Sequence, residues 1–103
     1  MNILMVRSKI KEENVADAQA ATERVFQAIE QAQPTGVRYA AGWLSDGVTL
    51  VALLEVENSE NPRSDNPLLA LPAYAELRDD LMQWYAEPSA VEHMTAIGSY
   101  RLF

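Results

Sequence analysis

The sequence predicts an α+β domain in which two helices cross one four-stranded antiparallel sheet, because three observations agree on this arrangement. Strand-like alternation and helix-like spacing of apolar residues follow each other in the order β-α-β-β-α-β. The dipeptide Asp46-Gly47 lies between two strand-like runs, which is typical of a hairpin. The chain has 103 residues, of which 49% are hydrophobic, enough for one buried core. We therefore expect residues 1–103 to form a single domain.

The first strand and the first helix follow from the spacing of their apolar residues. Residues 2–10 alternate as a strand does. The helix after them has Asn14 at its N-cap or in its first turn and ends at Pro34 and Gly36. The two sides of the strand bear Leu4, Val6 and Ile10, and Ile3 and Met5. The apolar stripe of the helix consists of Val15, Ala18, Ala21 or Thr22, Val25, Ile29 and Ala32.

The next two strands, residues 37–44 and 48–57, are expected to form the hairpin. Asp-Gly is the preferred filling of a two-residue type I′ turn, whose central residues both need positive φ. With that loop, Ser45 pairs with Val48 and the register of the whole hairpin is fixed. The facing pairs are then Arg38 with Glu55, Tyr39 with Leu54, Ala41 with Ala52, and Trp43 with Leu50.

The second half of the chain repeats the pattern of strand, helix and strand. Residues 58–66 are polar and contain Pro62, so they predict a solvated loop, and residues 67–70 fit a helical turn. A second helix begins near Pro72, buries Tyr74, Leu77, Leu81 and Trp84 or Tyr85, and stops before Pro88. The last strand covers residues 94–102. This element order is that of the ferredoxin-like plait.

The predicted sheet is apolar on both sides. Helices cover one face of such a plait, and a face in contact with water alternates with polar residues. The run from Leu50 to Leu54 instead places apolar side chains on both faces whatever the strand boundaries. Soluble monomers rarely expose an apolar patch of that extent. We therefore expect two copies of the chain to pair sheet against sheet as a symmetric homodimer.

Composition excludes several classes of function. The formal net charge is −7, which disfavours binding to a nucleic acid backbone. No cysteine is present, so disulfides, thiolate nucleophiles and iron–sulfur ligation are excluded. One histidine and scattered carboxylates give no metal-ligand spacing, and no cofactor is expected. The sequence has no apolar run long enough to span a membrane and no secretory signal pattern, so we expect a cytoplasmic protein without membrane contact.

Four aromatic side chains form the first candidate binding site. Tyr39 and Trp43 share one strand face, and Tyr74 and Trp84 lie on the inner face of the second helix. If both pairs point between the sheet and the helices, they line one apolar pocket for a small apolar or aromatic ligand. The alternative is that these aromatics are ordinary core, which is the commoner outcome of such spacing.

His93 is the second candidate, because it is the only histidine, and histidine is the side chain type that ordinarily changes charge near neutral pH. It would act as a general base at the start of the last strand. The alternative is a surface histidine beside Glu92, and this is favoured because no partner for it is recognisable. The serines lie in no nucleophile-elbow context.

The element order and four short sequences resemble the dimeric α/β-barrel superfamily, in particular the antibiotic-biosynthesis-monooxygenase-like group. The sequences are Trp-Leu-Ser-Asp-Gly-Val at 43–48, Leu-Pro-Ala-Tyr at 71–74, Val-Glu-His-Met at 91–94 and Gly-Ser-Tyr-Arg at 98–101. The resemblance covers nearly the whole chain and contains no catalytic signature. It implies a barrel formed by two sheets of a dimer.

The resemblance also implies a chemistry. In cofactor-free monooxygenases of this group, an electron-rich phenolic substrate is deprotonated and itself reduces oxygen. Tyr39, Trp43, Arg78 or His93 would orient the substrate and stabilise its anion, although Arg78 is expected to be a surface charge. The asparagine–tryptophan–arginine set of characterised oxygenases finds no positional match. The second helix lacks the histidine that ligates haem iron in the haem-degrading branch.

Three hypotheses follow for the function. The chain is an oxidoreductase or isomerase that acts on an aromatic or polyketide-like compound, a non-catalytic module that binds a small ligand, or a stress-associated homodimer without a ligand. The binding module is disfavoured because regulators of that kind carry a DNA-binding domain, which we do not expect in this sequence. Fold analogy favours the first hypothesis.

Overall fold

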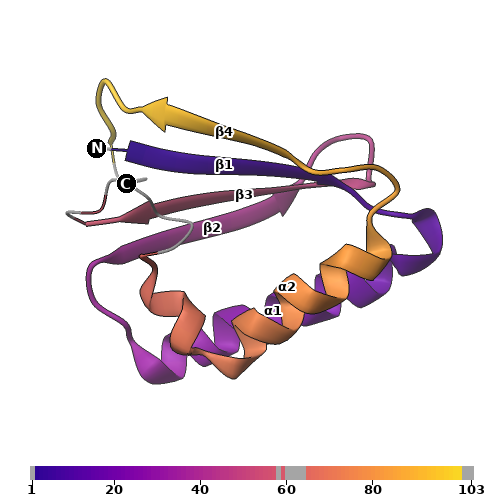
Figure 1. Cartoon of the computed structure of the whole chain (residues 1–103), viewed down its shortest axis with the longest axis horizontal. Helices are drawn as coiled ribbons and strands as arrows, with labels where there is room; N and C mark the ends of the chain where they lie inside the picture. Colours follow the sequence, from indigo (N-terminus) through magenta and orange to yellow (C-terminus); the bar gives the residue numbers. More distant parts are fainter. Residues whose placement is uncertain (1, 58, 60–64, 101–103) are drawn as a thin grey trace.

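The computed structural model describes residues 2–57, 59 and 65–100 (Figure 1). Their elements follow the predicted order. These are β1 (Asn2–Lys9), the 3-10 turn η1 (Glu12–Asn14), α1 (Val15–Ala32), β2 (Val37–Trp43), β3 (Thr49–Val56), the 3-10 turn η2 (Pro67–Ala70), α2 (Pro72–Trp84) and β4 (Ala90–Thr95).

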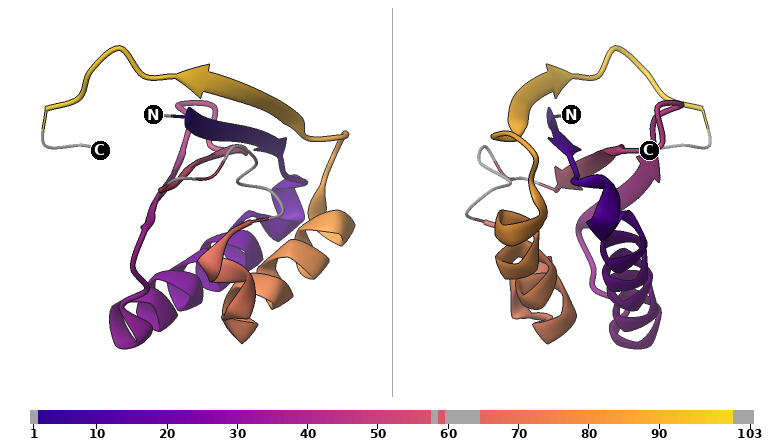
Figure 2. Two further views of the ribbon diagram at one scale, coloured as in Figure 1. Left: turned by 60° about the vertical axis from the view of Figure 1, so that its left-hand side comes forward. Right: turned by 90° about the vertical axis from the view of Figure 1, so that its right-hand side faces the viewer.

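The four strands form one sheet in the order β2-β3-β1-β4, and every neighbouring pair is antiparallel. Each helix therefore connects two strands that are separated by a third. Both helices lie side by side on one face of the sheet (Figures 1 and 2). This arrangement confirms the predicted α+β ferredoxin-like plait.

The core lies between the helices and the sheet. The predicted stripe of α1 is confirmed at Ala18, Ala21, Thr22 and Val25, which are buried, whereas Ala32 is exposed. The small side chains of α1 leave room for α2, whose Leu77 packs against this helix. A further buried cluster consists of Leu4, Leu54, Val56 and Leu68. Gln33, at φ 45°, takes the left-handed position at the end of α1, ahead of the expected Gly36.

The β2–β3 register is confirmed but the predicted turn type is wrong. Arg38 faces Glu55 and Trp43 faces Leu50, as expected. A type I′ turn needs positive φ at both central residues, and only Gly47 has it, at φ 75°. The loop is longer than two residues, because Leu44 N–H donates to the carbonyl of Thr49. Asp46 stabilises this loop by accepting hydrogen bonds from the backbone N–H groups of the two residues after Gly47.

The predicted position of the last strand, residues 94–102, is also wrong. β4 spans Ala90–Thr95, so His93 lies inside it, and the described residues from Ala96 onward lie outside the sheet. The chain returns to the sheet directly after α2, where Tyr85 forms a bridge with Ile10 and Ala86 N–H donates to Lys9 O. Residues 101–103, the rest of that prediction, lie outside the described residues.

The face of the sheet opposite the helices is apolar at its centre. Met5 of β1 faces Leu53 of β3, which in turn faces Ala40 of β2. All three are half-buried, and no described helix covers this face (Figure 2). The expected pairing of two sheets across this face stays a prediction. Among the described residues, no helix has the length and apolar character needed to cross a membrane.

Candidate functional site

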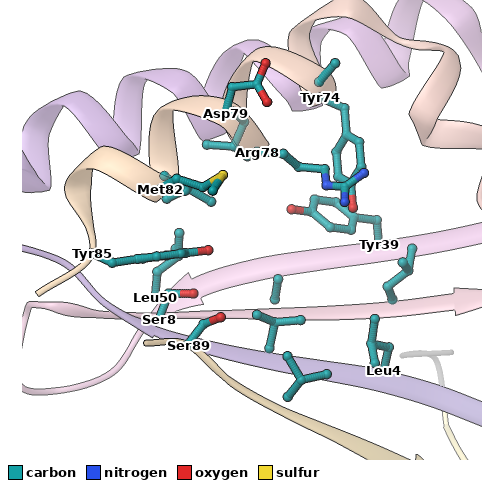
Figure 3. Close-up of a pocket in the computed structure, with 17 residues that line it drawn as sticks. Leu4, Ser8, Tyr39, Leu50, Tyr74, Arg78, Asp79, Met82, Tyr85 and Ser89 are labelled. Atoms are coloured by element: carbon teal, nitrogen blue, oxygen red, sulfur yellow. The ribbon is translucent and has the colours of Figure 1, made fainter. Parts of the chain in front are cut away.

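A cavity of about 490 Å³ lies between α2 and the helix-facing side of the sheet (Figure 3). Its sheet side is mainly apolar because the strands contribute alternate residues to it, whereas α2 contributes the polar side chains of Tyr74, Arg78 and Asp79. The apolar residues from β1 and β3 are Leu4, Val6, Leu50, Ala52 and Leu54. Ligand cavities of this size are typically apolar with a few convergent polar groups.

Tyr39 of β2 and Tyr74 of α2 meet in this cavity. Their ring centroids lie 6.0 Å apart at an interplanar angle of 87°, an edge-to-face contact, and Phe26 of α1 packs on Tyr39 at 5.3 Å. Burial raises the pKa of Tyr39 and also that of Tyr74, so both phenols stay protonated at neutral pH. No hydrogen bond among the described residues uses the Tyr39 hydroxyl, which points into the cavity in Figure 3.

The hydroxyl of Tyr74 has a defined hydrogen-bond direction. Asn66 Nδ2 donates to Tyr74 Oη at 3.4 Å, while Asn66 Oδ1 accepts from the backbone N–H of Leu68 at 2.9 Å. The second bond fixes which end of the amide faces the tyrosine. Because Tyr74 Oη accepts this bond, its own proton remains available to a ligand. Asn66 is therefore a positioning residue, and no sequence pattern predicted it.

Arg78 of α2 is exposed, in agreement with the predicted surface charge beside Asp79 and Asp80, and it also lines the same cavity, as does Asp79. Its guanidinium lies next to Tyr74 and Tyr39 in Figure 3. The positive charge lowers the pKa of Tyr74, which opposes the larger effect of burial. No ion pair of Arg78 occurs among the described residues. The cavity therefore contains a cation that is available to an anionic ligand.

A second group of polar side chains contributes Tyr85, Ser8 and Ser89 to the cavity wall. Figure 3 shows their hydroxyls at the end of the cavity away from Arg78 and Tyr74. Sequence reasoning did not find this group, although Ser8 shares the strand side of Leu4, Val6 and Ile10. The signal that could have found Ser8 is its hydroxyl among the apolar residues on that side of the strand.

The other aromatic candidates lie outside this cavity. Trp43 lines a smaller hollow between α1 and β2, and its Nε1 donates to Gln19 Oε1 at 3.2 Å. Trp84 packs on Ile10, Ala18 and Leu50 in the core. The structure thus brings together Tyr39 and Tyr74 of the four predicted aromatics.

His93 is also outside the cavity. It faces Leu4 across the β1–β4 pair, and it is exposed on the edge strand. Within the described residues, no group of three or more histidines and carboxylates is arranged to hold a metal ion.

Comparisons with known proteins show which solved structures share this fold. No protein-family model matches the chain, and no curated protein matches it. A solved antibiotic biosynthesis monooxygenase is 13% identical, with a TM-score of 0.72 over 95% of this chain and 100% of the other. A Nitrosomonas europaea protein, provisionally named an antibiotic biosynthesis monooxygenase, is 20% identical, with a TM-score of 0.73 over 95% and 100%.

SnoaB, a cofactor-independent oxygenase from Streptomyces nogalater, is 17% identical, with a TM-score of 0.64 over 95% of this chain and 94% of SnoaB. The chain has the ferredoxin-like fold of the antibiotic biosynthesis monooxygenase group. The predicted resemblance to this group is therefore confirmed at the level of fold. At these identities the likeness shows the fold alone.

Proposed function

We propose that the chain is a cofactor-independent oxygenase that acts on a small phenolic or enolic aromatic compound. One observation carries the proposal: the Arg78 guanidinium and the hydroxyls of Tyr39 and Tyr74 gather at one end of a cavity whose sheet side is mainly apolar (Figure 3). Apolar walls suit an aromatic skeleton, and a cation with two hydrogen-bond donors suits its oxygen atom once that atom is anionic.

The proposed role of the protein is to favour ionisation of the substrate. For a ketone conjugated with a CH₂ group through its aromatic rings, as in anthrone, loss of one proton from that CH₂ group to water gives an enolate, whose negative oxygen lies beside Arg78. Tyr39 and Tyr74 donate to the same oxygen, because their raised pKa values keep them protonated. Fixed donors aimed at a developing anion are the usual means by which proteins stabilise such charge.

The oxygen step then needs no external reductant. The enolate carbon gives an electron to O₂, and recombination forms a C–O bond and a hydroperoxide, which takes up one proton. Loss of water converts this hydroperoxide to a ketone. One oxygen atom of O₂ enters the product and the other leaves as water, and the CH₂ carbon supplies all four electrons.

Oxygen uptake with anthrone tests the proposal. Anthrone and O₂ give anthraquinone and water, and the protein should raise the rate above that of spontaneous oxidation. Arg78→Gln should remove most of this increase, whereas Arg24→Gln, at an exposed position of α1, should leave it unchanged. A rate equal to that without protein for anthrone and a panel of related phenols would contradict the proposal.

The second candidate function is non-catalytic binding of the same class of ligand. It is favoured by the position of His93, since no imidazole lines the described cavity and a general base that titrates near neutral pH is therefore missing there. Raised melting temperature with hydroxyanthraquinones, without oxygen uptake from any phenol, would support binding over catalysis.

We also propose that the chain acts as a homodimer through the apolar sheet face. Met5, Ala40 and Leu53 are aligned there across three strands and have no described helix above them. A stable interface of this kind buries roughly 800 Å² per partner. Sedimentation velocity at micromolar concentration should give a dimer, and Leu53→Glu should shift it to monomer. A monomeric wild-type protein would contradict the proposal.

A further inference from the structure

We propose that Ser8, Ser89 and Tyr85 form a second polar subsite, which binds an oxygen atom at the opposite end of the ligand from Arg78. The inference rests on the proposed function for the location of the ligand. It deepens that function by adding a contact at the end of the cavity away from Arg78.

The burial of Ser8 is the first observation. Ser8 is 2% exposed, and it lies on the helix-facing side of β1, which is otherwise apolar. Its hydroxyl lines the cavity, and none of the hydrogen bonds among the described residues uses it. A ligand oxygen in the cavity would supply the partner that Ser8 lacks.

The neighbours of Ser8 are the second observation. The β1–β4 register sets Arg7 opposite Ala90, and its continuation by one residue sets Ser8 opposite Ser89. Side chains that face each other across an antiparallel pair lie on the same face of the sheet. Tyr85 contributes its hydroxyl from the end of α2, which the Ile10–Tyr85 bridge fixes against β1. Three hydroxyls from three segments thus converge on one end of the cavity (Figure 3).

The spacing of the two polar ends sets the length of the ligand. Tyr39 lies at the level of Leu4, because both face Leu54. Ser8 is four residues further along β1, which corresponds to about 13 Å at about 3.3 Å per residue. The wall between them is made of Val6, Ala52 and other apolar residues. A single phenol ring is too short to reach both ends, whereas a linear three-ring skeleton with terminal oxygens matches the span.

Two ligands that differ in one hydroxyl test the subsite. The probes are 2,6-dihydroxyanthraquinone and 2-hydroxyanthraquinone, and their dissociation constants are measured by tryptophan fluorescence at the same pH. The wild-type protein should bind the dihydroxy compound about tenfold more tightly, as one further buried hydrogen bond predicts. Ser8→Ala should remove this preference and Ser89→Ala should reduce it. Ser45→Ala, in the exposed hairpin loop, should retain it.

The melting temperature of Ser8→Ala without ligand is an independent measurement. The Ser8 hydroxyl lines the cavity and makes no hydrogen bond among the described residues, so Ser8→Ala should have a melting temperature close to that of the wild type. A melting temperature several degrees lower would mean that the hydroxyl stabilises the fold, and would overturn the inference.

The binding results separate the inference from the proposed function. Equal affinity of the wild type for the two probes, a preference that survives in both serine variants, or binding of neither probe would overturn the subsite. A preference that depends on Ser8 would support the subsite even if anthrone oxidation were absent, in which case the catalytic proposal alone fails.

Discussion

Arg78→Gln should weaken binding of the ionised form of 2-hydroxyanthraquinone and leave binding of its neutral form unchanged. Arg78 lines the cavity beside Tyr74 and has no ion-pair partner among the described residues. Glutamine keeps a polar side chain on the exposed helix surface but removes the charge. The charge is therefore the only property expected to act on the ligand.

The magnitude follows from the position of Arg78. Hydrogen bonds to charged groups contribute roughly 1.5–3 kcal/mol. The lower value applies here, because Arg78 is exposed and solvent screens its charge. About 1.5 kcal/mol corresponds to about tenfold in the dissociation constant, and to about one unit in the pKa of the bound phenol.

The assay is a titration of affinity against pH for both proteins. The wild type should bind more tightly as pH rises from the pKa of the bound phenol to that of the free phenol, because binding favours the anion. Affinity should then stay constant at higher pH. Arg78→Gln should show less than half of this rise. Parallel curves for the two proteins, or equal weakening of the neutral and ionised forms, would refute the reasoning.

Two further predictions concern the tyrosines. Burial raises the pKa of Tyr39, so stability should be fully present below about pH 10, the pKa of the unfolded side chain, and should fall above it by up to about 1.4 kcal/mol per pH unit. Urea unfolding at several alkaline pH values should show a smaller slope for Tyr39→Phe, and an equal slope would contradict the prediction. Asn66→Asp retains an oxygen for the Leu68 N–H but accepts the Tyr74 proton instead of donating to Tyr74. The melting temperature should stay close to that of the wild type while affinity for hydroxyanthraquinones falls about tenfold, and unchanged affinity would show that the Tyr74 proton is not used.

The fold was predictable because its signals are local. The spacing of apolar residues on α1 and the Asp46-Gly47 dipeptide were sufficient for the helix and the hairpin register. The turn type was not, because the side chain of Asp46 binds the backbone after Gly47 and favours a longer loop. The last strand was predicted too far along the chain because β4 has few apolar residues of its own. Its pairing with β1 depends on where α2 ends.

The candidate site was only partly predictable, because it depends on which segments the fold brings together. Tyr39 and Tyr74 were found from their strand and helix faces, and these faces are confirmed. Trp84 lies on the same helix face as Tyr74 but at the C-terminal end of α2, where it packs against Ile10. The direction of the Arg78 side chain and the bond from Asn66 to Tyr74 depend on tertiary packing, which periodicity does not contain.

The central claim is that this cavity directs the attack of molecular oxygen on an ionised aromatic substrate without a bound cofactor. Mass spectrometry of the anthraquinone formed from anthrone under oxygen-18 gas measures this most directly. Carefully purified protein should yield a product with one heavy oxygen atom, faster than buffer alone and much faster than Arg78→Gln. Product formed at the spontaneous rate, or with its new oxygen derived from water, would contradict the account.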